Sequence, residues 1–226
     1  MRLLLFLSLL ISPVALAQDI PVETTAAADT IFKTYYPDGI YDTREDFIKK
    51  RSKNFPLTAK SILRRNSKKI IYKNGTPLSC LFYYTKTDER VSNIFAISFQ
   101  GELYFQVSAI LEHINRKDRF QDNDFAYNFV KVIIGGEHYF YTEAEMGDEF
   151  ELGLAMSAGA AGSIASHGMT KRKGIVWDLY KREFNIFKNC KDYNEFITPL
   201  YLEGVQECPK KQPDLAAIRK AIQMIK

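Results

Sequence analysis

Paired strand-like segments are the feature of this sequence that most restricts its fold. In each pair, two short runs rich in β-branched and aromatic residues are separated by a brief turn. A connection that short makes the two strands antiparallel neighbours. The four pairs are residues 69–73 with 78–84, 93–99 with 102–107, 129–134 with 138–142, and 175–179 with 183–187. The sequence therefore predicts an antiparallel sheet built from hairpins.

The second pair also indicates how the sheet is buried, because its residues alternate in polarity. The segment places Leu103, Phe105 and Val107 on one face and Glu102, Tyr104 and Gln106 on the other. This period of two is typical of a strand with one face on the core and one face in water. We expect this part of the sheet to be half-buried.

Helical signals lie at the two ends of the strand-rich region. Thr43 is a suitable N-cap, and Asp46 follows it at the spacing of a capping box. Near the C-terminus, Asp214 precedes apolar residues at helical spacing, namely Leu215, Ile218, Ile222 and Ile225. The chain has no βαβ rhythm and no internal repeat. We predict an α+β fold with a mostly antiparallel, meander-like sheet and flanking N- and C-terminal helices.

The N-terminus has the three parts of a secretory signal peptide. A basic Arg2 precedes the apolar run 3–11, and Ala15-Leu16-Ala17 supplies the small residues of a cleavage site. The apolar run is too short to span a bilayer, which disfavours an uncleaved anchor. We predict cleavage after Ala17 and an exported protein, periplasmic or extracellular. Residues 18–30 then form a flexible leader, and 31–226 form a single domain.

The chain contains three cysteines, and an oxidising compartment allows a disulfide. Cys190 and Cys208 lie on either side of a short helix-like stretch and form the natural pair. Cys80 lies in an apolar strand, where a thiol is more often a small buried hydrophobe than a nucleophile. We predict a Cys190–Cys208 disulfide and a free, buried Cys80.

Charge and motif patterns point to no cofactor, metal or nucleic acid. The formal net charge of +4 is dispersed, whereas phosphate binding needs a concentrated basic face. His113, His138 and His167 show no metal-ligand spacing. Calcium is an alternative for the acids of the 116–124 segment, but basic residues interleave them, so we expect a solvated loop. The basic run 171–173 is likewise expected to be solvated surface.

Residues 152–168 differ in composition from the rest of the chain. No acidic or basic residue lies between Leu152 and Ser166, and small residues recur four apart. Such ladders allow close helix approach. Three interpretations remain open: a flexible loop, a tightly packed helix, and a segment for self-association or membrane-surface contact. The candidate association residues are Gly153, Ser157, Gly159, Ala161, Gly162 and Ala165.

The residues Asp38-Gly39-Ile40-Tyr41-Asp42-Thr43-Arg44-Glu45-Asp46-Phe47 resemble the opening of a group of uncharacterised exported bacterial proteins. In that group, a DGIY-x-T-x-x-DF opening precedes a stretch like residues 93–105, then a Gly-rich apolar insert, a hairpin and a closing helix. The resemblance covers most of the chain after the leader. It implies an envelope or secreted location and no known activity, so no site residue is carried over.

These observations lead to two functional hypotheses. The first is an envelope-associated protein without catalysis, which binds or assembles through its sheet face or through residues 152–168. The alternative is a periplasmic, hydrolase-like enzyme whose site is dispersed along the chain. A pocket lined by several acids together with His113 or His138 would favour the enzyme.

Overall fold

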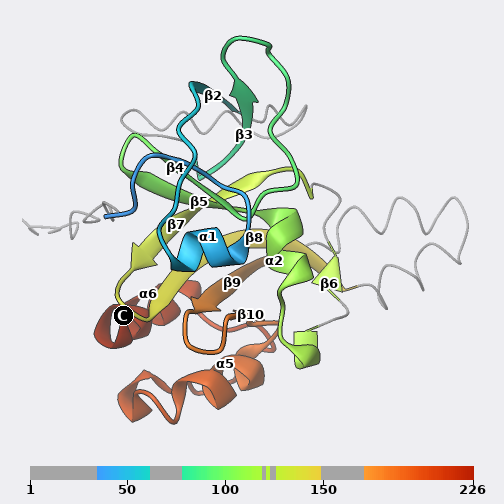
Figure 1. Cartoon of the computed structure of the whole chain (residues 1–226). Helices are drawn as coiled ribbons and strands as arrows, with labels where there is room; N and C mark the ends of the chain where they lie inside the picture. Colours follow the sequence, from blue (N-terminus) through green and yellow to red (C-terminus); the bar gives the residue numbers. More distant parts are fainter. Residues whose placement is uncertain (1–34, 62–77, 119–120, 123–125, 149–170) are drawn as a thin grey trace, which may run out of the picture. The chain divides into compact units, whose positions relative to one another are not determined.

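The strands form one antiparallel sheet, shown in the computed structural model of Figure 1. The structure describes residues 35–61, 78–118, 121–122, 126–148 and 171–226, and all of them belong to one unit of the chain, residues 31–226. The strands of this described part are β1 (Gly39–Tyr41), β2 (Leu57–Ser61), β3 (Ser79–Tyr84), β4 (Ala96–Phe99), β5 (Glu102–Gln106), β6 (Gln121–Asp122), β7 (Phe129–Gly135), β8 (Tyr139–Asp148), β9 (Lys171–Asp178) and β10 (Glu183–Ile186).

Short helices join and cover the strands. They are α1 (Arg44–Ile48), α2 (Val107–Glu112), the 3₁₀ helix η1 (Arg116–Asp118), α5 (Cys190–Ile197), the 3₁₀ helix η2 (Leu202–Gly204) and α6 (Leu215–Ile225). The predicted N-caps are confirmed: Thr43 accepts a hydrogen bond from Asp46 N, and Asp214 accepts from Ala216 N. The helices α2 and η1 were not predicted. No helix in the described part of the chain is long and apolar enough to cross a membrane.

The predicted fold class is confirmed, since the strands described by the structure pair antiparallel throughout and three neighbouring pairs are hairpins. The main path of the sheet runs β1-β4-β5-β7-β8-β9-β10, while β3 pairs with both β2 and β7, and β6 pairs with β8. Three predicted hairpins form, as β4–β5, β7–β8 and β9–β10. The strand 69–73 of the remaining pair lies outside the described residues.

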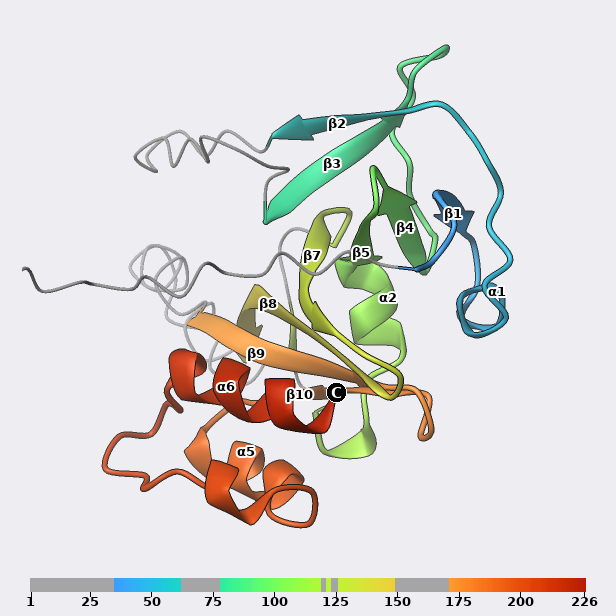
Figure 2. The same ribbon diagram turned by 90° about the vertical axis from the view of Figure 1, so that its left-hand side faces the viewer.

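The sheet curls, so that several strands are buried on both faces. Along β9, Ile175 and Trp177 join a core cluster that includes Phe47 of α1, whereas Val176 joins a second cluster beneath α5 and α6. Figure 2 shows α6 lying along β9, with α5 farther from the sheet. A third cluster unites Cys80 of β3 with Tyr104 of β5.

The expectation of a half-buried strand is wrong for β5. All five residues of Glu102–Gln106 are buried, because β3 covers the face that carries Tyr104. The Phe82 and Tyr104 rings lie 5.2 Å apart across this contact. The polar residues of that face are paired in part: Glu102 forms a buried ion pair with Lys131 at 2.7 Å, and Gln106 Oε1 accepts from Ile94 N, whereas the buried Gln106 Nε2 has no hydrogen-bond partner among the described residues. Val107, predicted to end the strand, begins α2 instead.

The DGIY-x-T-x-x-DF opening is explained by its structural contacts. Asp38 accepts hydrogen bonds from Ser98 Oγ and from the backbone N–H groups of the β4–β5 turn, at 3.0–3.2 Å. Gly39 has a φ of +140°, and a Cβ there would lie 2.6 Å from Lys53 O. Phe47 is fully buried and stacks on Tyr36 at 4.5 Å. The motif therefore holds β1 against the β4–β5 hairpin and packs α1 onto the core.

Candidate functional site

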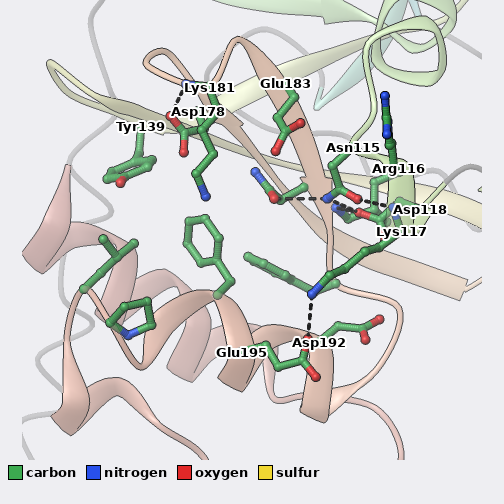
Figure 3. Close-up of a pocket in the computed structure, with 16 residues that line it drawn as sticks. Asn115, Arg116, Lys117, Asp118, Tyr139, Asp178, Lys181, Glu183, Asp192 and Glu195 are labelled. Atoms are coloured by element: carbon green, nitrogen blue, oxygen red, sulfur yellow. Dashed lines mark hydrogen bonds and ion pairs between the residues drawn. The ribbon is translucent and has the colours of Figure 1, made fainter.

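A pocket with a volume of about 630 Å³ lies between the β9–β10 hairpin, η1 and α5. Five carboxylates, three basic side chains and several apolar side chains line it. Figure 3 shows Lys181 and Glu183 projecting from the hairpin toward α5, which carries Asp192 and Glu195. The volume falls in the range of small-molecule sites, which makes this pocket the candidate functional site.

One wall of the pocket is organised by Asp118, which is only 4% exposed. Its carboxylate accepts hydrogen bonds from Asn115 Nδ2 at 2.7 Å and from Ile186 N at 2.9 Å. It also pairs with Lys188 Nζ at 3.0 Å. The predicted solvated loop is therefore wrong at this residue: Asp118 is buried because it accepts from the backbone N–H of Ile186 and pairs with the partly buried Lys188.

Lys188 links this wall to α5. Its Nζ donates to Lys117 O at 2.7 Å and lies 3.5 Å from Asp192 Oδ2. Burial alone would lower the pKa of Lys188, but the hydrogen bond and charge of Asp118 outweigh it and raise the pKa above its usual value. Lys188 is therefore a fixed cation behind the pocket.

The second acid of the wall, Asp178, stabilises the β9–β10 turn. It is 2% exposed, and its Oδ1 accepts from Tyr180 N and Lys181 N, both at 3.0 Å. These bonds fold the chain back so that Lys181 and Glu183 face the pocket. Asp118 and Asp178 therefore both hold the backbone around the pocket.

Asn185 has an amide group with one unsatisfied end. Asn115 is oriented by two bonds, because its Oδ1 accepts from Lys117 N at 2.8 Å and its Nδ2 donates to Asp118. That Nδ2 also donates to Asn185 Oδ1 at 3.0 Å. The orientation of the Asn185 amide follows from this chain of bonds. Its Nδ2 is buried and has no acceptor.

An unsatisfied buried donor costs about 1–3 kcal/mol, so its presence in a pocket calls for an explanation. Glu183 lies two residues before Asn185, on the same face of β10. Burial raises the pKa of Glu183, Lys181 opposes the shift, and the charges of Asp178 and Asp118 add to it. Both residues line the pocket, and within the described part of the chain the Glu183 carboxyl and the buried Asn185 Nδ2 are without a hydrogen-bond partner.

Aromatic rings form the apolar side of the pocket. The Phe196 ring of α5 lies 5.3 Å from Phe187 and 5.8 Å from Tyr139. The Cys190–Cys208 disulfide, with Cα atoms 5.7 Å apart, holds the start of α5. This confirms the predicted pair, and Cys80 is free and buried as predicted.

The structure does not bring the histidines to this site. Neither His113 nor His138 lines the pocket; the His138 ring instead lies 4.7 Å from that of Tyr180. Within the described ranges, no group of three or more His, Cys, Asp or Glu side chains is arranged to hold a metal ion. The candidate association residues of 152–168, together with His167, lie outside the described residues.

The prediction of solvated surface for the basic run 171–173 holds for Lys171 and Arg172, which are exposed, although Arg172 also pairs with Glu143 at 2.7 Å. It is wrong for Lys173, which is only 6% exposed and donates to Gln121. Sequence reasoning missed the pocket residues Glu183 and Asn185 as well. Their alternation with Phe184 and Ile186 has the pattern of an ordinary solvent-facing strand side, and only α5 and η1 turn that side into a pocket wall.

Comparison of the chain with models of known protein families, with curated proteins and with solved structures finds no match.

Proposed function

We propose that this chain is an exported binding protein without catalysis, which holds a small ligand in the pocket between β10 and α5. The observation that carries the proposal is the buried Asn185 Nδ2, a donor without an acceptor beside the unpaired carboxyl of Glu183. A ligand that accepts from this amide would satisfy a group that the fold leaves unsatisfied at a cost. The aromatic rings opposite would cover its apolar part.

The pocket offers less support to the alternative, a hydrolase with a dispersed site. Its acids include Asp118, which accepts from Ile186 N and pairs with Lys188, and Asp178, whose Oδ1 accepts from two backbone N–H groups of the hairpin turn. Hydrolysis by carboxylates needs a working pair, and nucleophilic hydrolysis needs a nucleophile beside a base. An acidic pocket together with His113 or His138 would have favoured an enzyme. The acids line this pocket, but neither of these histidines does.

Export is part of the proposal and rests on the signal-like residues 1–17 and on the Cys190–Cys208 pair, which suits an oxidising compartment. Self-association or membrane-surface contact through residues 152–168 stays a prediction from composition. Light scattering and liposome flotation of the chain lacking residues 155–165 test it. The deletion should change association while leaving the sheet folded.

The binding proposal is tested with Asn185→Leu, with exposed Gln223→Leu as a matched control. The ¹⁵N-labelled protein is titrated with separate mixtures of free amino acids, short peptides and monosaccharides. At least one mixture should shift the amide resonances of β10 and α5, and Asn185→Leu should abolish the shifts. The same variant should melt close to the wild type, because it removes an unsatisfied buried donor together with the acceptor of one Asn115 hydrogen bond.

Two results would reject the proposal. One is the absence of pocket shifts with every mixture, and the other is an unchanged response of Asn185→Leu. Conversion of a probe to products during the titration would instead support the hydrolase.

A further inference from the structure

We infer that the pocket selects a zwitterionic amino compound, with an ammonium group at Glu183, a carboxylate at Asn185 and Lys181, and an apolar body on the aromatic rings. This inference rests on the proposed binding function and goes beyond it by naming the ligand chemistry. The compound is a free apolar amino acid or a short apolar peptide, both of which carry these groups.

The ammonium end follows from the acids that the fold leaves unpaired. Glu183 lines the pocket and has no hydrogen-bond or ion-pair partner within the described part of the chain. Burial raises the pKa of Glu183, the charge of Lys181 opposes this shift, and the charges of Asp178 and Asp118 add to it, so a cationic ligand group beside the carboxyl would offset the cost of its burial. An ammonium group here would form a charge-assisted hydrogen bond with the carboxylate.

The carboxylate end follows from the donors beside Glu183. Asn185 Nδ2 is fixed by the bond between Asn185 Oδ1 and Asn115, so it cannot rotate away to find another acceptor. Lys181 is held by its backbone bond to Asp178, and its side chain extends toward the pocket, as Figure 3 shows. An amide N–H and an ammonium together form a suitable pair of donors for a carboxylate.

The spacing of the two ends fits a compact zwitterion. Residues two apart on one strand are separated by about 7 Å. Both side chains leave the same face of β10, so an ammonium and a carboxylate carried by one ligand can each approach one of them.

The apolar side of the pocket determines the character of the ligand body. Phe187, Phe196 and Tyr139 present ring faces and edges, which favour an aromatic or large aliphatic side chain. The volume of about 630 Å³ also admits a second residue. For this reason the free amino acid and the short peptide are compared directly in the test.

The test uses the purified chain and four probes in isothermal titration calorimetry. The probes are L-phenylalanine, L-alanyl-L-phenylalanine, phenethylamine, which lacks the carboxylate, and 3-phenylpropionate, which lacks the ammonium. At least one zwitterion should bind about tenfold or more tightly than either single-charge analogue, as expected for a charge-assisted hydrogen bond. The zwitterion that binds more tightly indicates whether the pocket takes a free amino acid or a short peptide.

Two variants assign the ends. Glu183→Gln should weaken the binding of the zwitterion and of phenethylamine while leaving that of 3-phenylpropionate unchanged. Asn185→Leu should weaken the binding of the zwitterion and of 3-phenylpropionate while leaving that of phenethylamine unchanged. The circular dichroism spectrum and melting temperature of each variant establish that it is folded. Equal binding of phenethylamine and L-phenylalanine would overturn the inference. So would a loss of affinity for both single-charge analogues in each of the two variants.

The experiments distinguish a wrong ligand class from a wrong binding function. If none of the four probes binds but another mixture shifts the β10 and α5 resonances in an Asn185-dependent manner, the binding function holds and the zwitterion inference is wrong. If no mixture acts at the pocket, both are wrong.

Discussion

Glu143 in β8 shows how single side chains hold distant parts of this protein together. Its side chain is completely buried and accepts from Tyr141 Oη at 2.9 Å, Arg172 Nε at 2.7 Å and Arg219 Nε at 2.7 Å. Arg219 belongs to α6, so this carboxylate ties the C-terminal helix to the sheet. Burial and the neighbouring charge of Glu143 raise the pKa of Tyr141, which keeps its hydroxyl a donor.

Replacement of Gly174 tests this arrangement. A Cβ at Gly174 would lie 2.9 Å from Tyr141 Oη and 3.1 Å from Phe187 Cδ2. We expect Gly174→Ala to reduce the free energy of unfolding by about 1–3 kcal/mol, as overpacking does. Urea denaturation measures the change. In a double-mutant cycle, Tyr141→Phe should recover part of the loss, and full additivity would show that the hydroxyl is not the obstacle.

The reactivity of Cys80 follows from its burial. Burial, with a smaller effect from the charge of Glu102, raises the pKa of the thiol to about 12. At pH 8 the thiolate is therefore scarce and shielded, and a disulfide reagent should detect no thiol in the native protein. In denaturant without reductant, the reagent should detect one thiol per chain. A rapid native reaction would contradict the buried position.

Glu183 makes stability depend on pH. Because its pKa is raised in the folded state, its contribution is fully present below the unfolded value of 4.5 and is lost as pH rises through the folded pKa. Glu183→Gln should remove this loss of unfolding free energy, because glutamine does not ionise. The free energy of unfolding of the variant should therefore rise relative to that of the wild type as pH increases from 4 to neutrality. Urea unfolding at several pH values measures the difference, with exposed Glu207→Gln as control. A constant difference would contradict the raised pKa.

The element that completes the pocket is α5. Asn189 caps it by accepting from Asp192 N at 2.9 Å, and Tyr193 and Ile197 bury its inner face against β8 and β9. Lys117 reaches across from η1 to Glu195 at 3.1 Å. The helix is short, so its position depends on these tertiary contacts and on the disulfide more than on helix propensity.

Removal of the disulfide should loosen α5 without disrupting the rest of the sheet. The bridge closes a segment with a sequence separation of 18 residues. Replacing Cys190 and Cys208 by serine should lower the free energy of unfolding by about 3 kcal/mol. Hydrogen exchange should accelerate most in α5 and the 202–211 segment. Uniform acceleration across β4 and β5 would contradict a local role; Cys80→Ala serves as the control for loss of a thiol.

At the scale of the whole molecule, the curled sheet separates three apolar clusters. The pocket lies beside β9 and β10, the last two strands of the chain. The largest cluster is dominated by rings, including the Phe95 and Trp177 pair at 5.1 Å. Much of the aromatic content seen in the sequence is therefore core, which agrees with the ordinary role of alternating aromatics in sheets. The pocket instead uses rings that lie on the outer, helix-covered face.

The export prediction also belongs to the whole molecule. Protein recovered from the exported fraction should begin at Gln18, because Ala15 and Ala17 provide the small residues of a signal-peptidase site. N-terminal sequencing or intact mass measures this, with allowance for cyclisation of the terminal glutamine. Exported protein that retains residues 3–10 would contradict cleavage.

Local patterns determined the parts of this protein that depend on near neighbours in the chain. Strand periodicity and short turns predicted three hairpins of the described chain, and Thr43 and Asp214 predicted two helix starts. The Cys190–Cys208 pair was also predicted from spacing and compartment. Each of these features depends on residues close together in the sequence, so the sequence carries its signal directly.

Only the tertiary structure decided which polar residues are buried and which surface becomes a site. Asp118 was predicted to be solvated and β5 half-buried, yet both are covered by segments far away in the chain. Glu183 and Asn185 form a pocket wall because η1 and α5 approach β10 from positions about 70 residues before and immediately after it. Burial depends on such long-range packing, and periodicity within one strand does not reveal what lies against its second face.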